Sequence, residues 1–466
     1  MLERLWSMSQ DTTIYVVGGA VRDAVLNKKT HDYDILLPEP GFLAHLASVS
    51  RALGLEPYAL NLEHKLWRYQ RSSAVIDVAP CGEGLEKNLR HRDFTVNSMA
   101  LKLSDYLQGD LTQLIDPCQG RADLSRRELS PSSSSALRDD PIRVLRAARF
   151  MGELGLTPTL ELNRQAESAA VALRQTPGER VWNELYQVTN CSNAPELYDW
   201  LDNVGALAAI LPELEAEKGI EQNQYHSFCV YEHSRRAFAA YLNLWERSTF
   251  LSPNLQDKVR AELQGMDPRL QAICRLGALV HDIGKPKAKS FKDDGRVTFY
   301  RHEQVGAEMI PHIAQRLRLS GLESKALARF VRWHTYLAQL ARQPRLNEGH
   351  LHRVARRLGT YSVPIALFNI ADLLGKGEDM TDDTSFEQMT TAVSRYLHAW
   401  YYQHDEVIYP TLPINGAELS VQLGLPPGRW LNDMLSYLGE QAAMGRVQDR
   451  DCAIKLAREY YRRMPR

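Results

Sequence analysis

The sequence lacks paired cysteines and long hydrophobic runs, and each absence excludes a class of protein. Its six cysteines are dispersed, with no C-x-x-C spacing of the kind found in zinc knuckles or redox pairs. Dispersed cysteines are typical of reduced cytosolic proteins. No run of 18 apolar residues occurs, and the first residues, MLERLWSMSQDTT, contain no apolar signal-peptide core. We therefore expect no signal peptide, no membrane-spanning helix and a cytoplasmic location.

The sequence also lacks an excess of charge of either sign. Its formal net charge is −1, which argues against a uniformly basic surface that coats nucleic acid, although a local basic face remains possible. The content of 44% hydrophobic and 24% charged residues is ordinary for a globular protein and excludes disordered, collagen-like and coiled-coil classes. A chain of 466 residues is too long for one hydrophobic core, so about three domains are expected.

Strand patterns are confined to the first part of the chain. Apolar runs at 14–17, 33–37, 74–79 and 99–103 predict strands, and amphipathic pieces such as GFLAHLASVSRALG lie between them. The serine-rich segment 131–139 has the composition of a flexible hinge, and helical patterns follow it to the end. The predicted fold class is α+β, a small mixed α/β head followed by helical parts. The expected domains are a head at 1–128, a helical neck at 129–215, a histidine-rich helical domain at 216–385 and a helical tail at 386–466.

A glycine pair and two aspartates form the first motif, in IYVVGGAVRDAVLNKKTHDYDILL. Gly18 and Gly19 end a predicted strand just before a helix, an arrangement that lets backbone N–H groups approach phosphate, although a plain turn is by itself the better explanation of the pair. Asp32 and Asp34 lie two residues apart on a predicted strand, so both carboxylates project from one face. Because two adjacent like charges repel, a bound divalent cation explains them better than a structural role does.

Asp77 is a third acid, within the apolar run AVIDVAP. A half-buried strand would favour a hydrophobic residue there, although a solvated edge position would also tolerate an acid. Together with Asp32 and Asp34, it completes the oxygen ligands that Mg²⁺ prefers, with room left for water and substrate phosphates. The three acids therefore predict two-metal nucleotidyl transfer.

Arginines recur every third residue in DDPIRVLRAARF, residues 139–150. A helix is predicted to start at the Asp139–Pro141 segment, and on that helix Asp140, Arg143, Arg146 and Arg149 form one ridge about 13 Å long. A solvated basic face is the simpler explanation, but no acid on the helix relieves the repulsion. Guanidinium groups suit phosphates and base edges. We expect Asp140 and Arg143 to face a base, and Arg146 and Arg149 to lie nearer phosphates or RNA.

A fourth segment, RHRDFTVNSMA, lies between these motifs, and its Arg92 is either part of a helix cap or a contact to phosphate or ribose. In order and spacing, VVGGAVRD, HDYD, RHRDFTVNSMA and DDPIRVLRAARF resemble the class II (bacterial type) tRNA nucleotidyltransferases and poly(A) polymerases, which build or repair the 3′ CCA end of tRNA. The C-terminal stretch YPTLPINGAELSVQLGLPPGRWLNDML is also similar to that family, which implies a tRNA-binding tail.

The resemblance implies a role for each matching residue. It implies that Asp32 and Asp34 hold Mg²⁺, that Asp140 and Arg143 select the incoming base, and that CTP and ATP are substrates. The remaining nucleotide-binding positions that it implies are Gly18, Gly19, Arg22, Arg92, Arg146 and Arg149.

The sequence departs from the family pattern at three places. His91 stands where Arg is usual, and Asp139 where Glu is frequent. The third departure is the short segment from Asp77 to His91, where relatives that add the whole CCA have a longer flexible loop. This shortening resembles the branch that adds only CC.

Histidines and acids recur through the helical body. Each lies in or beside a helical pattern where a polar group needs a partner, and imidazole with carboxylate is a ligand set for a transition metal. Their order resembles the HD phosphohydrolase domain, which implies metal-dependent hydrolysis of a phosphoester. The predicted ligands are His233, His281, Asp282, His302, His334 and Asp372. Lys285 and Lys287 are either phosphate contacts or solvated.

The sequence therefore predicts a bifunctional enzyme: a tRNA nucleotidyltransferase that adds C, A or both, joined to an HD phosphohydrolase. Three alternatives remain at this point. One is a poly(A) polymerase, although neither an extra motif after the neck nor a basic C-terminal extension is found. The second is an HD-type phosphohydrolase whose head senses nucleotides. The third is a non-catalytic RNA-binding protein, against which the intact acids and arginines count.

Overall fold

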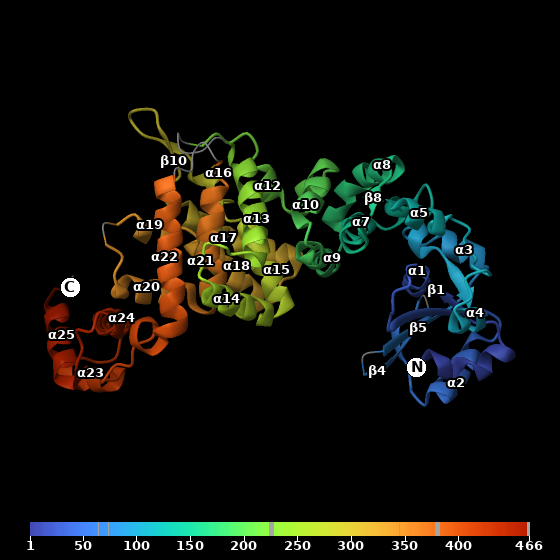
Figure 1. Cartoon of the computed structure of the whole chain (residues 1–466), viewed down its shortest axis with the longest axis horizontal. Helices are drawn as coiled ribbons and strands as arrows, with labels where there is room; N and C mark the ends of the chain where they lie inside the picture. The colour runs from blue at the N-terminus through green and yellow to red at the C-terminus, as the bar shows by residue number, and fades with distance from the viewer. Residues whose placement is uncertain (64, 73, 223–227, 344, 378–382, 464–466) are drawn as a thin grey trace. The chain divides into compact units, whose positions relative to one another are not determined.

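The computed structural model describes residues 1–466 except 64, 73, 223–227, 344, 378–382 and 464–466. It divides the chain into two compact units, Met1–Ile210 and Leu211–Arg466 (Figure 1). Each unit is described by itself. The predicted boundary at residue 215 lies close to this division, while the finer domain limits stay predictions.

A six-stranded sheet forms the centre of the first 130 residues (Figure 1). Its order is β3-β4-β5-β2-β1-β6, with β2 and β5 parallel and the other neighbours antiparallel. The four predicted strands are confirmed, whereas β3 and β4 were not predicted. The strands are β1 (Tyr15–Val17), β2 (Asp32–Leu37), β3 (Tyr58–Asn61), β4 (Leu66–Arg71), β5 (Ala74–Pro80) and β6 (Ala100–Lys102).

Short helices connect these strands. The amphipathic segment predicted after the second strand is α2 (Phe42–Leu53), which buries Phe42, Leu46, Val49 and Leu53 on one face. Gly54 ends this helix in the left-handed conformation that glycine adopts without strain. The other helices of this part are α1 (Gly19–Val25), α3 (Leu85–Arg90), α4 (Leu103–Gln108) and α5 (Gly120–Arg126).

The serine-rich segment is not a free linker, contrary to expectation. The backbone N–H of Thr95 donates to the carbonyl of Ser130, and that of Ser132 donates to the carbonyl of Asp93. In addition, β7 (Glu128–Leu129) pairs with β8 (Thr157–Pro158) across the predicted boundary between head and neck. These backbone bonds connect the sheet domain to the helices that follow it.

The helix that carries the arginine ridge begins later than predicted. Asp139 ends the short helix α6 (Ala136–Asp139), Asp140 has an extended backbone, and α7 (Arg143–Leu154) begins two residues after Pro141. The N–H groups of Arg143 and Val144 nevertheless donate to the carbonyls of Asp140 and Pro141, so the predicted start at 139–141 is a tight turn that leads into the helix. The helices that complete this unit are α8 (Leu160–Ala169), α9 (Gly178–Asn190), α10 (Ala194–Asn203) and α11 (Ala206–Ile210).

In the second unit, helices pack around α21 (Ser362–Leu374), which is buried on nearly all sides (Figure 1). Such an apolar helix is stable only at the centre of a bundle. Its neighbours include α13 (Val230–Glu246), α14 (Pro253–Gly265), α15 (Pro268–Leu279), α19 (Tyr336–Ala341), α20 (Glu348–Leu358) and α22 (Asp383–Tyr402). Also present are α12 (Pro212–Glu215), α16 (Lys285–Ala288), α17 (His302–Leu317), α18 (Gly321–Trp333) and a small hairpin of β9 (Ser290–Phe291) and β10 (Val297–Thr298).

The C-terminal helices have a hydrophobic core of their own, which includes Leu419, Met434, Leu438 and Ala453. They are α23 (Gly416–Leu423), α24 (Trp430–Ala443) and α25 (Arg450–Arg463). The predicted tail boundary at 385/386 falls inside α22, which packs on α21 and therefore belongs to the bundle.

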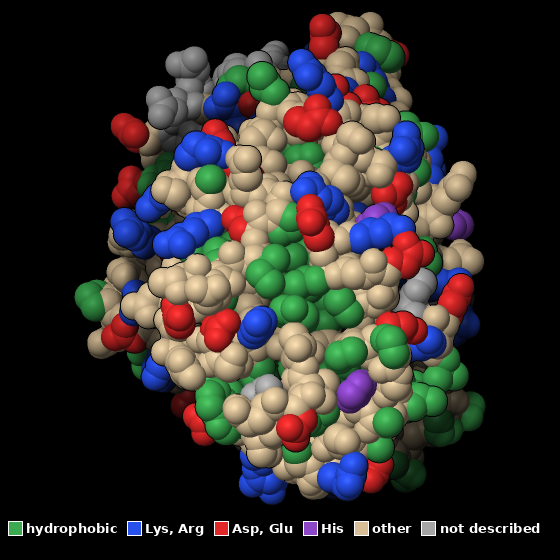
Figure 2. Space-filling model, turned by 90° about the vertical axis from the view of Figure 1, so that its right-hand side faces the viewer, with side chains coloured by type: hydrophobic (Ala, Val, Ile, Leu, Met, Phe, Trp, Pro, Cys, Tyr) green, Lys and Arg blue, Asp and Glu red, His purple; other side chains and the backbone are tan. Residues whose placement is uncertain are grey.

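The surface agrees with the balanced composition. On the face displayed in Figure 2, Lys and Arg side chains alternate with Asp and Glu side chains, and neither sign forms a continuous field. Across the helices that the structure describes, none has the length and hydropathy needed to cross a lipid bilayer.

Candidate active sites

Three carboxylates meet on the sheet. In the parallel pairing of β2 with β5, Asp34 is the direct partner of Asp77, and Asp32 projects from the same face as Asp34. Burial and the neighbouring Asp77 raise the pKa of Asp32. Burial also raises the pKa of Asp34, as do Asp77 and Asp32, against the opposing effect of Arg92. A set of three neighbouring carboxylates, two of them with a raised pKa, is one that a divalent cation would stabilise.

Two arginines stand beside these acids. Arg68 on β4 binds both oxygens of Asp77, with Nε–Oδ1 and Nη2–Oδ2 distances of 2.7 Å each. Arg92 Nη1 lies 3.6 Å from Asp34 Oδ2. Arg68 was missed at the sequence level, because its place opposite Asp77 depends on the pairing of β4 with β5. The acids keep free coordination positions and fit Mg²⁺, which prefers few carboxylates together with water and phosphate oxygens.

The glycine pair brings the backbone close to this site. Gly18 has a φ of +73°, and a Cβ atom placed on it would lie 2.5 Å from Arg92 Nη1. Only glycine fits this combination of conformation and contact. Arg22, one turn into α1, donates to Asn97 Oδ1 at 2.8 Å and lies with its guanidinium 5.5 Å from the centre of the Phe150 ring. Gly18, Arg22 and Arg92 therefore lie together at one end of the carboxylate face.

Asp140 and Arg143, the two residues expected to contact the incoming base, form hydrogen bonds within the protein in this structure. The Arg143 guanidinium donates to three backbone carbonyls, those of His91, Arg92 and Ala136, at 3.0, 3.2 and 2.9 Å. Asp140 Oδ2 accepts a bond of 2.7 Å from Arg180 Nη2, on α9. Arg143 thus connects the head segment around residue 92 to the first helix of the neck, and Arg180 was missed at the sequence level.

Arg146 and Arg149 are also paired, and the expectation that no acid relieves their repulsion is wrong. Arg146 donates to Asp93 Oδ2 at 2.6 Å through Nη2. Arg149 Nε lies 2.8 Å from Glu184 Oε2, and Arg146 also contacts Glu184. Burial opposes ionisation of Asp93, but Arg146 outweighs it and lowers the pKa of that acid. Glu153 on the same helix lies 3.6 Å from Arg149, but the closer partners Asp93 and Glu184 come from other parts of the chain, so the helix sequence alone could not reveal them.

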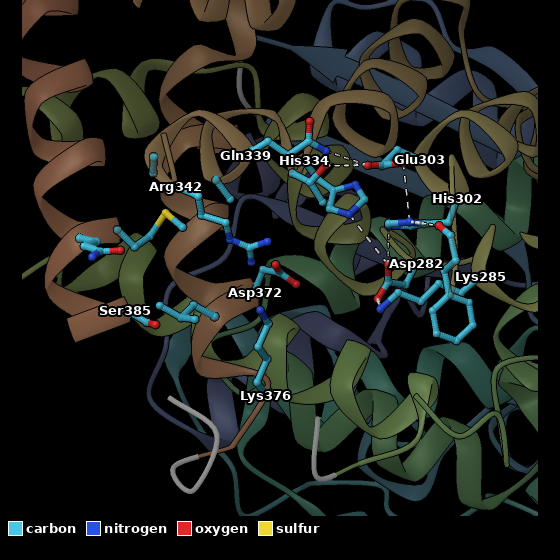
Figure 3. Close-up of a pocket in the computed structure, with 17 residues that line it drawn as sticks. Asp282, Lys285, His302, Glu303, His334, Gln339, Arg342, Asp372, Lys376 and Ser385 are labelled. Atoms are coloured by element: carbon cyan, nitrogen blue, oxygen red, sulfur yellow. Dashed lines mark hydrogen bonds and ion pairs between the residues drawn. The ribbon is translucent and has the colours of Figure 1, made fainter. Parts of the chain in front are cut away.

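The six predicted HD residues converge in the second unit. Four of them, Asp282, His302, His334 and Asp372, line the cavity shown in Figure 3. His281 and Asp282 follow α15, His302 begins α17, and His334 follows α18. His281 Nε2 and His302 Nε2 lie 3.0 and 3.2 Å from the two oxygens of Asp282. His233 on α13 lies 3.0 Å from Asp372 on α21. Segments separated by 139 positions in the sequence thus supply one cluster.

Backbone contacts orient three of these imidazoles. The Nδ1 atoms of His281, His302 and His334 lie 2.9, 3.0 and 2.8 Å from the carbonyl oxygens three residues earlier. When Nδ1–H donates to a carbonyl, the lone pair is on Nε2, the atom that faces the cluster. A Cβ atom on Gly284 would overlap the His302 carbonyl, so glycine is needed for this close packing.

Asp282 lies between two groups of possible ligands. His233 and His281 approach its Oδ2, while His302 and His334 approach its Oδ1. Each group, with Asp282, brings its ligand atoms within 4.8 Å of one another. His281 Nε2, His302 Nε2 and Asp282 Oδ2 are buried and make no well-directed hydrogen bond. Ligand atoms that point to a common centre in this way fit one or two divalent transition metals.

Charges in the cluster are strongly coupled. Burial opposes a charge on His281, but Asp282 and Asp372 outweigh it and raise the pKa of His281 to about 10. Burial and the neighbouring His281 and His302 lower the pKa of His334 to about 4. Lys285 Nζ lies 2.6 Å from Asp282 Oδ2, while Lys287 is exposed. The cluster therefore holds mixed protonation states that a bound cation would change.

Three residues near the cluster were missed at the sequence level. Arg342 and Lys376 line the same cavity of about 640 Å³, where Figure 3 shows their charged ends beside Asp372. Glu217 is fully buried, and burial, with Asp282 nearby, raises its pKa to about 8. None of the three has a motif around it, so only the packing of the helices places them here.

Comparisons with known proteins agree with both sites. Residues 14–53 and 58–130 match the poly A polymerase head domain, and residues 230–362 match the HD domain. The first match contains the three carboxylates, and the second contains five of the six HD residues, all but Asp372.

Relatives match along most of the chain. The A-adding tRNA nucleotidyltransferase of Deinococcus radiodurans is 30% identical, with 93% of this chain and 92% of that protein covered. The CC-adding tRNA nucleotidyltransferase of Thermus thermophilus is 28% identical, with 93% and 90% covered. A solved structure, the Thermotoga maritima CCA-adding enzyme complexed with tRNA, superposes with a TM-score of 0.64 over 99% of this chain and 95% of that one. Its identity of 17% shows a shared fold alone.

Proposed function

We propose that this chain, which belongs to the tRNA nucleotidyltransferase family, extends the 3′ end of tRNA with nucleotides taken from CTP, ATP or both. The observation that carries the proposal is the convergence of Asp32, Asp34 and Asp77 on one face of the sheet. A poly(A) polymerase is disfavoured because two relatives that match 93% of this chain are named as tRNA nucleotidyltransferases.

The residues of the head divide the work of transfer. Mg²⁺, held by Asp32 and Asp34 with support from Asp77, would supply activation of the 3′-hydroxyl and neutralisation of the triphosphate. Arg68 orients Asp77 through its two hydrogen bonds. Arg22 and Arg92 present donors at the glycine end, where the triphosphate is expected. Asp140 and Arg143 offer an acceptor and donors to the incoming base, and Arg180 orients Asp140 through its hydrogen bond to Oδ2.

The number of nucleotides added depends on the segment after Asp77. Only the four residues 81–84 separate β5 from α3, so no long flexible loop is present there. This supports CC addition, although relatives of both the A-adding and the CC-adding kind match the chain.

The test uses tRNAs that end before C74, before C75 and before A76, each supplied with CTP or ATP alone. Incorporation of CTP into the first two, with no use of ATP on the third, is expected. Addition of A to the third tRNA would refute the CC assignment, and failure with all three would refute the transfer activity. Long adenylate tails on a generic RNA would instead identify a poly(A) polymerase.

We propose a second activity for the histidine-rich cluster, hydrolysis of a phosphoester at an RNA end. His233, His281, Asp282, His302 and His334 would hold one or two cations, and Arg342, Lys285 and Lys376 surround the cluster with positive charge. The metal would supply an activated water and polarise the phosphoryl group. Release of phosphate from RNA bearing a 3′-phosphate, or opening of a 2′,3′-cyclic phosphate, tests the activity after loading with Mn²⁺, Ni²⁺ or Zn²⁺. Wild-type protein that binds these metals yet hydrolyses neither RNA end would refute it.

A further inference from the structure

A second cavity, of about 300 Å³, lies beside the metal cluster and has no role in the functions described above. It is lined by three arginines, Arg301, Arg332 and Arg357, and by two aromatic residues, Trp333 and Tyr336. Its volume lies at the lower end of the range for small-ligand sites.

This arginine-aromatic pocket adjoins the cavity of the HD cluster. Glu303, Thr335 and Gln339 line both cavities. Two of the proposed metal ligands are immediate sequence neighbours of the pocket, because Arg301 precedes His302 and Trp333 precedes His334. The backbone of Arg301 has a φ of +61°, a conformation that residues other than glycine adopt only at a cost in conformational energy. A ligand in the pocket would therefore lie within a few ångströms of the residues that hold the metal.

The three arginines form no ion pair within the described part of the chain, and Glu440 is a carboxylate whose pKa is raised by burial and lowered in part by Arg357 from a greater distance. Among the described residues, no carboxylate lies within ion-pair distance of Arg301, Arg332 or Arg357, whereas Arg146 and Arg149 in the first unit are each paired. Glu303 is the one acid in the pocket, and its Oε1 accepts bonds from Thr335 and Gln339 at 2.8 and 3.1 Å. The pocket thus keeps a surplus of guanidinium donors, which suits phosphate groups.

The aromatic rings hold the guanidinium planes in place. The Arg357 guanidinium lies 3.9 Å from the centre of the Tyr336 ring and 4.7 Å from that of Trp333. Arg332 lies 5.0 Å from the Trp333 ring centre. A guanidinium fixed on an aromatic ring still has its N–H donors for phosphate, and its other face can stack on a base. Such alternation of Arg and aromatic groups is typical of sites for single-stranded RNA.

We propose that this pocket binds the nucleotide next to the end of a single-stranded RNA, and so directs the terminal phosphate into the metal cluster. The proposal rests on the phosphohydrolase activity assigned to the HD cluster. It adds a substrate class to that activity: RNA ends are favoured over free phosphate esters, because only an RNA end fills both cavities. Arg357 and Arg332 are specificity-determining residues that contact the RNA backbone and base, without a role at the reacting phosphorus.

The test compares two substrates on the full-length, metal-loaded protein: a trinucleotide with a 3′-phosphate and a small aryl phosphate ester. Arg357→Ala and Arg332→Ala are expected to raise KM for the trinucleotide about tenfold or more, with kcat and all constants for the aryl ester unchanged. Arg357→Lys should recover only part of the loss, since Lys lacks the planar fork. Arg260→Ala, an exposed arginine of the same unit that pairs with Asp257, is the matched control.

A binding measurement separates this proposal from the hydrolysis on which it rests. The trinucleotide with a 3′-hydroxyl, the expected product, is titrated into metal-loaded protein at several salt concentrations by fluorescence anisotropy. Arg357→Ala should weaken binding and lower the salt dependence by about one released counterion. Weaker binding by Arg357→Ala supports the pocket even if neither substrate is hydrolysed. Absence of hydrolysis would refute only the phosphohydrolase activity of the HD cluster. Equal binding by wild type and by Arg357→Ala, with unchanged melting temperatures, overturns the pocket assignment and leaves the arginines as structural contacts.

Discussion

The two candidate metal sites differ in the kind of structure that holds them. In the head, adjacent strands present carboxylates on an open face, where the Asp34 side chain is 47% exposed. In the second unit, loops and helices surround Asp282, whose side chain is 1% exposed. An open carboxylate face suits Mg²⁺, which keeps water and takes phosphate oxygens from its substrate. A buried histidine cluster suits a transition metal that the protein itself encloses.

The sites also differ in how their charges are balanced without a metal. In the head, burial is the main cause that raises the pKa of Asp32 and of Asp34, and the neighbouring Asp77 adds to it in both cases. In the HD cluster, burial opposes ionisation of Asp282, but His281 and Lys285 outweigh it and hold its pKa well below the usual value. A cation in the head would therefore relieve repulsion between the carboxylates. In the HD cluster, by contrast, His281 and Lys285 already balance the charge of Asp282.

The largest effect is expected from Asp34→Asn in the head. Nucleotide transfer should fall by about 10³-fold, because a preorganised charge at the reacting centre is lost. The melting temperature should stay equal or rise, since a carboxylate with a raised pKa destabilises the fold above that pKa and Asn carries no charge. Transfer is measured with CTP and tRNA, and Asp11→Asn, an exposed acid of the same unit, serves as control. A rate of nucleotide transfer within tenfold of the wild-type rate would show that Asp34 is not a catalytic residue.

The bridging position of Asp282 is tested by counting metals. Asp282→Ala should remove both ions and abolish hydrolysis while leaving nucleotide transfer intact, whereas His334→Ala should remove one ion. Metal per chain is measured by mass spectrometry after dialysis, with Asp294→Ala in the exposed hairpin as control. Equal loss in the two cluster variants would contradict a bridging carboxylate.

A smaller effect is expected for Arg68→Ala, which removes the partner of Asp77. Loss of a residue that orients a metal ligand typically costs about 10- to 100-fold in activity or metal affinity. Transfer should fall in that range, and the Mg²⁺ concentration for half-maximal activity should rise. Arg71→Ala, at the exposed end of the same strand, should change neither quantity. If Arg68→Ala needed the same Mg²⁺ concentration as the wild type, Arg68 would not be required to orient Asp77.

The smallest effect concerns Glu217, beside the HD cluster. Burial raises the pKa of Glu217 to about 8, above the ordinary value of 4.5, so the native state binds more protons than the unfolded state between these pH values. Stability of the metal-free protein should therefore fall as pH rises from 4.5 to 8, by at most about 1.4 kcal/mol per pH unit from this group. Glu217→Gln should flatten that slope in urea unfolding, and Glu215→Gln, an exposed neighbour, should not. Parallel slopes for wild type and Glu217→Gln would show that Glu217 is ionised when buried.

Local patterns predicted much of this protein. Alternating apolar residues located β1, β2, β5 and β6, and the spacing of Asp32 and Asp34 placed both on one face, because a strand alternates its side chains. The four ordered motifs identified the family, which the comparisons confirm. The six HD residues were proposed because imidazoles and carboxylates are rare inside apolar helices and because their order resembles the HD domain, a family that matches residues 230–362.

Pairings between distant segments could not be predicted in this way. The sequence showed a ridge of unrelieved arginines, but Asp93 and Glu184 neutralise it from other elements. It showed Asp77 without Arg68, and Asp140 without Arg180. Each of these partners is set by strand pairing or helix packing, which no local period encodes.

The sequence by itself determined the family, the strands that carry the acids and the two sets of candidate metal ligands, because these depend on local period, motif order and residue chemistry. The tertiary structure decided which acid meets which base, and it created the buried Glu217 and the arginine-aromatic pocket. Those features depend on contacts between helices far apart in the chain, where burial and charge act through space rather than along the sequence.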